Sequence, residues 1–82
     1  IYRGYKYSSV MARKAKIDFP EIDLKKSIMA GDSKSDMQFG RNAGMINAFI
    51  SENNEMINEN PELIDFSFPN LLSFAKEIKP NP

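Results

Sequence analysis

Two aspartates four positions apart, Asp32 and Asp36, are the residues of this chain best suited to chemistry. They lie in residues 27–36, which read SIMAGDSKSD. A short apolar run leads into Gly31, where glycine lets the backbone turn sharply, and Ser33 adds a hydroxyl to the same turn. Two carboxylates beside a tight turn suit Mg²⁺, which usually takes one or two protein carboxylates together with waters and a substrate phosphate. The spacing therefore predicts a magnesium site on this turn.

The same residues also have a purely structural interpretation. An Asp-Ser pair is common in turns, where its side chains bond to the nearby backbone. Asp36 stands where the next helix should begin, and an acidic residue is favoured there as a cap or by the helix dipole. Spacing alone leaves both interpretations open.

The composition excludes several other kinds of site. The chain has 82 residues with no Cys and no His, which rules out thiolate and Ser–His nucleophiles and the usual zinc ligands. Carboxylates without imidazole favour a hard cation such as Mg²⁺. Eleven basic and eleven acidic residues give a net charge of zero, which argues against binding to nucleic acid or to an anionic membrane.

The charges are unevenly divided along the chain. Residues 1–41 hold nine basic and five acidic side chains, whereas residues 42–82 hold two basic and six acidic ones. One interpretation is two solvated faces of opposite sign. The other is that the basic first half helps to hold an anion such as phosphate.

Apolar patterning and capping residues predict the elements that position the two aspartates. In chain order we expect a helix from Ser8 or Ser9 to about residue 16, a strand over 27–30, a helix over 35–43, a strand over 45–50, an exposed loop over 51–62, a strand over 64–68, and a helix that opens at Pro69 and Asn70 and runs to Ile78. Strands that alternate with helices predict an α/β domain with a parallel sheet. Ligands bind beyond the carboxyl ends of such strands, which is where residues 31–36 fall.

The run from Ile22 to Met45 resembles the C-terminal half of haloacid-dehalogenase-like (HAD) phosphatases. It contains a strand, Gly-Asp-x-x-x-Asp, a helix, Ala-Gly and a second strand, which is that family's acidic motif. The likeness is closest to the capless heptose-bisphosphate and histidinol-phosphate phosphatases, and it extends less specifically to residues 65–71. It implies a three-layer, Rossmann-like parallel sheet, of which residues 1–82 would be the C-terminal portion.

The resemblance also implies roles for particular residues. Asp32 would be the metal ligand, and Asp36, with Gly31 and Ser33, would support the metal or the phosphate. Lys6 falls where the family carries a catalytic lysine, which would neutralise the transferring phosphoryl group. The residues after Lys6 depart from the family's Lys-Pro-x-Pro-Gly-Met pattern, since this chain reads Lys-Tyr-Ser-Ser-Val-Met.

The family's nucleophile has no counterpart in this sequence. It is the first aspartate of an Asp-x-Asp motif after the first strand, and no Asp-x-Asp occurs in residues 1–82. We therefore expect the nucleophile to lie before Ile1. The resemblance then implies a Mg²⁺-dependent phosphate-monoester hydrolase that acts on a small phosphorylated metabolite through an aspartyl-phosphate. The lack of a signal segment and of Cys in residues 1–82 is compatible with a cytoplasmic protein.

Heptose phosphate, histidinol phosphate and a generic sugar phosphate all remain open as substrates. The alternative is a binding or scaffold module that kept the fold and lost the chemistry. Another phosphate-binding parallel-sheet protein is less favoured, because neither Gly-x-x-x-x-Gly-Lys-Ser/Thr nor Gly-x-Gly-x-x-Gly occurs.

Overall fold

The computed structural model of the chain describes residues 1–18 and 27–80. Its elements are β1 (Tyr5–Tyr7), α1 (Ser9–Asp18), β2 (Ile28–Gly31), α2 (Lys34–Asn42), β3 (Ile46–Ile50), α3 (Asn54–Glu59), the 3-10 helix η1 (Pro61–Leu63), β4 (Phe66–Phe68), α4 (Leu71–Ala75) and β5 (Ile78–Pro80). Residues 22–26, the first part of the family-like run, lie outside the described residues. None of the helices in the described part has the length and apolar character needed to span a membrane.

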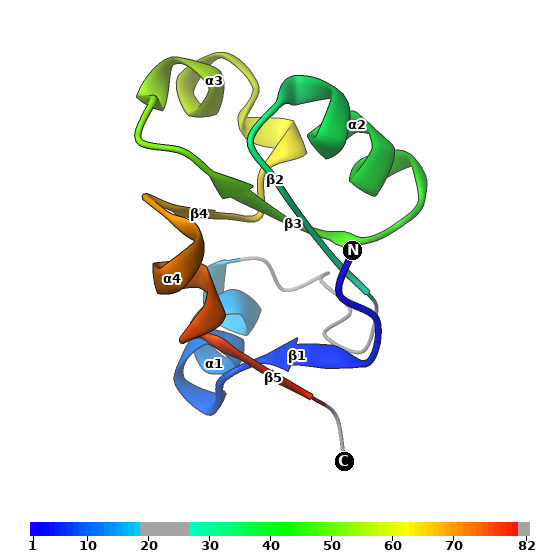
Figure 1. The fold of residues 1–82 in the computed structure, drawn as a ribbon, viewed down its shortest axis with the longest axis vertical. Helices are drawn as coiled ribbons and strands as arrows, with labels where there is room; N and C mark the ends of the chain where they lie inside the picture. Colours follow the sequence, from blue (N-terminus) through cyan, green and yellow to red (C-terminus); the bar gives the residue numbers. More distant parts are fainter. Residues whose placement is uncertain (19–26, 81–82) are drawn as a thin grey trace.

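Three strands form a parallel sheet in the order β2-β3-β4 (Figure 1). Gly31 at the end of β2 lies opposite Phe49 of β3, and Ile50 at the end of β3 lies opposite Phe68 of β4. The carboxyl ends of these strands therefore meet at one edge of the sheet. This confirms the predicted α/β arrangement with a parallel sheet, and each strand lies within two residues of its predicted range.

The sheet separates two apolar clusters. The larger cluster is formed by buried side chains from the sheet, β1, α1 and α4: Tyr7, Ala15, Ile28, Ile46, Ala48, Phe66, Phe68 and Phe74. The smaller one gathers Met37 of α2, Phe49 of β3 and Ile64, with side chains of α3 and η1 against it. Residues of β3 alternate between the two clusters, because successive side chains of a strand point to opposite faces. Helices therefore cover both faces of the sheet.

The predicted exposed loop over residues 51–62 is wrong. The structure has helix α3 there, followed by η1. The Asn53 side chain caps α3 by accepting a 2.9 Å hydrogen bond from the Glu55 amide, and Pro61 begins η1, where its missing N–H costs nothing. Met56 and Ile57 of α3 pack against the smaller cluster. Apolar side chains spaced among Asn and Glu residues thus hold this segment against the sheet.

The last helix is shorter than predicted. α4 ends at Ala75, and Ile78 begins β5, which pairs antiparallel with β1. The Ser8 amide donates a 2.6 Å hydrogen bond to the Glu77 carbonyl, and Tyr7 lies opposite Ile78. Pairing with a strand far away in the sequence thus overrides the helical spacing of the apolar residues, and Ile78 packs, partly buried, against the larger cluster.

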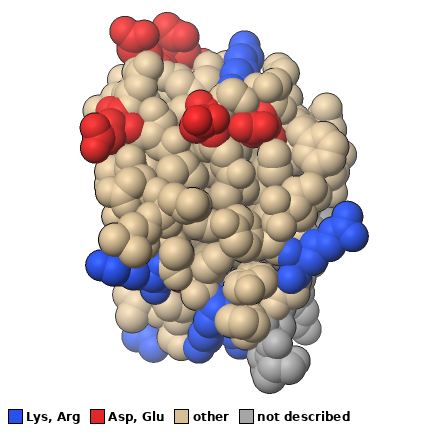
Figure 2. All heavy atoms as spheres, viewed as in Figure 1, with Lys and Arg blue, Asp and Glu red and all other residues tan. Residues whose placement is uncertain are grey.

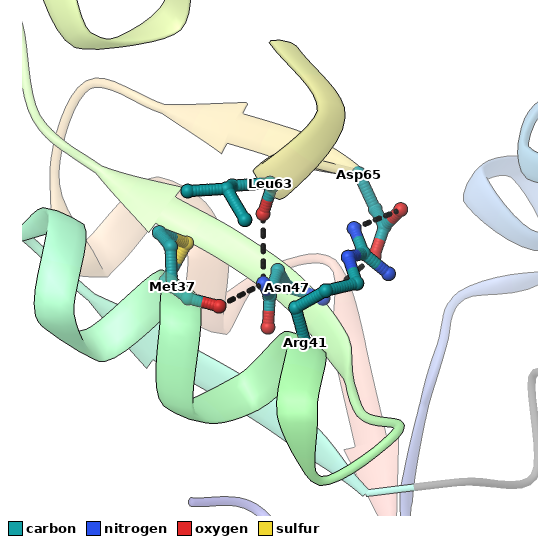
Figure 3. A network of polar contacts seen from close by, with 5 residues as sticks. All are labelled: Met37, Arg41, Asn47, Leu63 and Asp65. Carbon is teal, nitrogen blue, oxygen red and sulfur yellow. Dashed lines mark hydrogen bonds and ion pairs between the residues drawn. The ribbon is translucent and has the colours of Figure 1, made fainter. Parts of the chain in front are cut away.

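A buried asparagine of β3 ties the sheet to the elements on one of its faces (Figure 3). The Asn47 side chain is fully buried, and its amide nitrogen donates 2.7 Å hydrogen bonds to the carbonyls of Met37 in α2 and Leu63 in η1. The Asn47 backbone amide donates a 2.8 Å bond to Asp65, whose carboxylate also accepts a 3.0 Å bond from Arg41. One side chain therefore fixes α2 and η1 on the same strand.

Gly40 allows α2 to approach this asparagine closely. A Cβ at Gly40 would overlap the Asn47 side-chain oxygen and the Met29 side chain. Glycine is normally unfavourable inside a helix, so its presence here is explained by the close packing of α2 on β2 and β3.

Replacing Asn47 by alanine should strongly destabilise the fold. The substitution leaves the buried Met37 carbonyl and the part-buried Leu63 carbonyl without this donor, and we expect the free energy of unfolding to fall by about 2–4 kcal/mol. Urea unfolding followed by circular dichroism measures this. Asn58→Ala, at an exposed position of α3, is the control and should change the stability by less than about 0.5 kcal/mol. Equal effects of the two substitutions would contradict the role given to Asn47.

Tyr7 is the largest fully buried side chain of the core. Its ring lies 4.2 Å from the Phe66 ring, and its hydroxyl has no hydrogen-bond partner among the described residues. Burial raises the pKa of the Tyr7 hydroxyl far above its usual range, and the negative charge of Asp65 raises it further. The folded protein therefore keeps the Tyr7 proton at a pH where the unfolded chain loses it.

Tyr7 should make the fold sensitive to alkali. Unfolded tyrosine loses its proton near pH 10, so unfolding releases a proton above that pH and the stability contributed by Tyr7 falls as pH rises. In Tyr7→Phe we expect a shallower loss of stability between about pH 10 and 11.5. Tyr5→Phe, on the same strand but only half-buried, should follow the wild-type curve. Identical slopes for all three proteins would show that Tyr7 is not protected.

Candidate functional site

A pocket of about 650 Å³ lies beyond the carboxyl ends of β2 and β3. Its lining consists of Ile1, Tyr2, Ala30, Gly31, Asp32, Asp36, Ile50 and Leu71. Both predicted metal-binding carboxylates are therefore in it, at the edge of the sheet where the topology predicts a ligand.

The two aspartates reach the pocket from the turn between β2 and α2. β2 ends at Gly31, and Asp32 follows with an exposed side chain. Ser33 is the N-terminal cap of α2, and its hydroxyl accepts a 3.2 Å hydrogen bond from the Asp36 amide. This bond holds Asp36 in the first turn of α2, where the helix dipole stabilises its negative charge.

Gly31 is required where Asp36 passes over it. A Cβ at Gly31 would collide with the Asp36 carboxylate. Any other residue would push this side chain away from the end of β2. The absence of a side chain at Gly31 thus creates a cradle for the Asp36 carboxylate beside Asp32.

The buried network around Asn47 holds α2 in place beneath this turn. Met37, whose carbonyl accepts the Asn47 bond, follows Asp36 directly in the chain. Asp36 is therefore fixed from two sides, by the Ser33 cap before it and by the Asn47 bond after it. Rigid support of this kind is what a functional carboxylate needs.

The two carboxylates match the ligand preference of Mg²⁺. Among residues 1–18 and 27–80, no group of three or more acidic side chains is gathered as a metal cage would require. Mg²⁺ is usually bound by one or two carboxylates, with waters and substrate phosphates filling the other positions. Asp32 and Asp36, in the cradle formed by Gly31, supply a donor set of that kind.

Lys6 lies elsewhere. It is the central residue of β1, opposite Lys79 of β5, and it does not line the pocket. No Lys or Arg is present in the lining that the described residues form. On the face of the molecule drawn in Figure 2, Lys and Arg lie mainly over one half and Asp and Glu mainly over the other. The structure thus brings Gly31, Asp32 and Asp36 together, with Ser33 as a cap, and leaves Lys6 outside.

The sequence analysis did not identify the rest of the lining. Leu71 falls within the helix predicted to run from Pro69 to Ile78, and it is 55% exposed and borders the pocket. Tyr2 reaches the pocket because its backbone bridges to Ile28 at the start of β2. One feature of the sequence could have indicated Leu71. It directly follows Asn70, the capping residue with which a helix begins at the edge of the sheet that bears the pocket.

Comparison with protein-family models, with curated proteins and with solved structures gives no match. The likeness to HAD phosphatases remains a prediction that depends on the motif and its place in the fold.

Removal of the Ser33 cap should loosen the start of α2. Ser33→Ala removes the acceptor of the Asp36 amide, and loss of such a cap costs about 1 kcal/mol. Ser67→Ala, at an exposed position of β4, is the matched control. Urea unfolding should show the lower midpoint for Ser33→Ala only, and the absence of any difference would mean that the cap does not stabilise α2.

Proposed function

We propose that the protein is a Mg²⁺-dependent phosphate-monoester hydrolase of the HAD type. The observation that supports this proposal is the presence of Asp32 and Asp36 in one pocket beyond the carboxyl ends of β2 and β3. We also propose that the parallel sheet is the C-terminal portion of a three-layer, Rossmann-like domain of that type.

In this proposal the two aspartates have related roles. Asp32 would ligate Mg²⁺, and Asp36, fixed by the Ser33 cap, would orient the waters around it. When bound, Mg²⁺ would neutralise negative charge on the phosphate. Asp36 would keep its carboxylate in the cradle over Gly31, so that it faces the same space as Asp32.

The reaction would be hydrolysis of a phosphate monoester. A carboxylate nucleophile, which we assign to an aspartate before Ile1, would attack phosphorus and form an aspartyl-phosphate as the ester P–O bond breaks. A second aspartate, which we also assign to the segment before Ile1, would donate a proton to the leaving oxygen, and water would then hydrolyse the aspartyl-phosphate and release phosphate. Lys6 has no part in the proposed site, because it lies on β1 outside the lining.

A binding module without catalysis is the second candidate. It is favoured by the position of Lys6 and by the lack of an Asp-x-Asp motif in residues 1–82. Such a module would use Asp32 and Asp36 to hold Mg²⁺ with a phosphorylated ligand and would leave the ester intact.

Asp32→Asn should abolish hydrolysis. The full-length protein is assayed for phosphate release from a panel of phosphate monoesters with Mg²⁺. We expect the substitution to lower kcat/KM by at least about a hundredfold, because the cation stabilises the transition state by several kcal/mol. Asp18→Asn makes the same chemical change at an exposed residue outside the lining and should leave kcat/KM unchanged. Unchanged turnover in Asp32→Asn would refute the assignment.

The assay also separates the two candidate functions. The binding module predicts that no ester is hydrolysed. It also predicts that the wild type binds Mg²⁺ and phosphate, and that Asp32→Asn weakens this binding.

A further inference from the structure

The lining of the proposed site combines polar and aliphatic side chains. Among the described residues that line the pocket, only Asp32, Asp36 and Tyr2 carry polar side-chain atoms. The other lining side chains are aliphatic: Ile1, Ala30, Ile50 and Leu71. The pocket therefore combines an acidic part, at the turn after β2, with an apolar wall.

Two parts of this wall are held firmly. The Tyr2 backbone exchanges two hydrogen bonds with Ile28, of 2.8 and 3.1 Å, and the Tyr2 ring lies 5.2 Å from the Phe74 ring in an edge-to-face contact. Ile50 is the last residue of β3 and is paired with Phe68 of β4. These side chains are in place before a ligand arrives, which lowers the entropic cost of binding.

Leu71 forms the border of the wall at the start of α4. Asn70 caps this helix by accepting a 2.8 Å hydrogen bond from the Ser73 amide, which fixes the position of Leu71. The Leu71 side chain is 55% exposed, although it borders a pocket. A half-exposed leucine at such a place gains by contact with an apolar ligand.

We propose that the group esterified to the phosphate is apolar, an alkyl or aryl group, and that Leu71 and Ile50 select it. This inference rests on the proposed hydrolase function and narrows its substrate class away from the sugar phosphates that the sequence resemblance implies. A volume of about 650 Å³ is within the range of small-molecule sites, and it leaves room for a substituent beside the phosphate.

The chemistry of the wall explains the selection. Hydroxyl groups of a polyhydroxylated substituent that lie against this wall must give up water, and the aliphatic side chains offer them no donor or acceptor in return. The two carboxylates are already engaged with the cation and its waters. An alkyl group loses nothing by leaving water and is therefore preferred.

A matched pair of esters tests the proposal. Hexyl phosphate and a hexitol phosphate are both primary phosphates of a six-carbon chain and differ in the hydroxyl groups. We expect the full-length protein with Mg²⁺ to hydrolyse hexyl phosphate with the higher kcat/KM, by about tenfold or more. Leu71→Asn should lower kcat/KM for hexyl phosphate by about tenfold and change that for the hexitol ester by less than about twofold.

Leu72→Asn is the control for this substitution. Leu72 is the next residue of α4, is 67% exposed and does not line the pocket, so neither ester should respond to its replacement. Preference for the hexitol ester, or equal effects at Leu71 and Leu72, would overturn the apolar selection and leave the hydrolase function standing. Hydrolysis of no ester in the wider panel would reject the hydrolase function and this inference with it.

Discussion

The buried side chain of Asn47 is the constraint on which the site depends. Its amide nitrogen must find acceptors, because an unpaired donor in a core is costly, and it finds them in the carbonyls of Met37 and Leu63. The side-chain oxygen has no partner among the described residues. These bonds fix α2 against β3, and Gly40 lets the two approach closely. Asp36 precedes Met37 and is therefore held in place by a polar contact within the core. The stability of the fold and the geometry of the pocket are thus coupled through one residue.

The sheet and the turn that bears the two aspartates could be predicted from the sequence, because both depend on local signals. The short apolar run that leads into Gly31 predicted β2, and the predicted helix over 35–43 lies one residue from α2, although its cap is Ser33 and not Asp36. The position of Asp32 then followed from the rule that ligands bind at the carboxyl ends of parallel strands. The structure agrees with each of these steps.

What could not be predicted depends on contacts between residues distant in the sequence. Ile78 fits a helical stripe, and only its pairing with Tyr7 places it in β5. Tyr2 and Leu71 enter the pocket because the fold brings two segments far apart in the sequence to the same edge of the sheet. Lys6 was assigned by counting along a family pattern, and the pairing of β1 with β5 places it away from the pocket.

The central claim is that Asp32 and Asp36 form one cation site, and paramagnetic broadening by Mn²⁺ tests it most directly. Substoichiometric Mn²⁺ is titrated into the ¹⁵N-labelled full-length protein, and Mg²⁺ is then added in excess. We predict that the amide signals of Gly31, Asp32 and Asp36 broaden first, that Lys6 is little affected, and that Mg²⁺ reverses the effect. Broadening centred on other acidic residues, or none at these three, would contradict the claim.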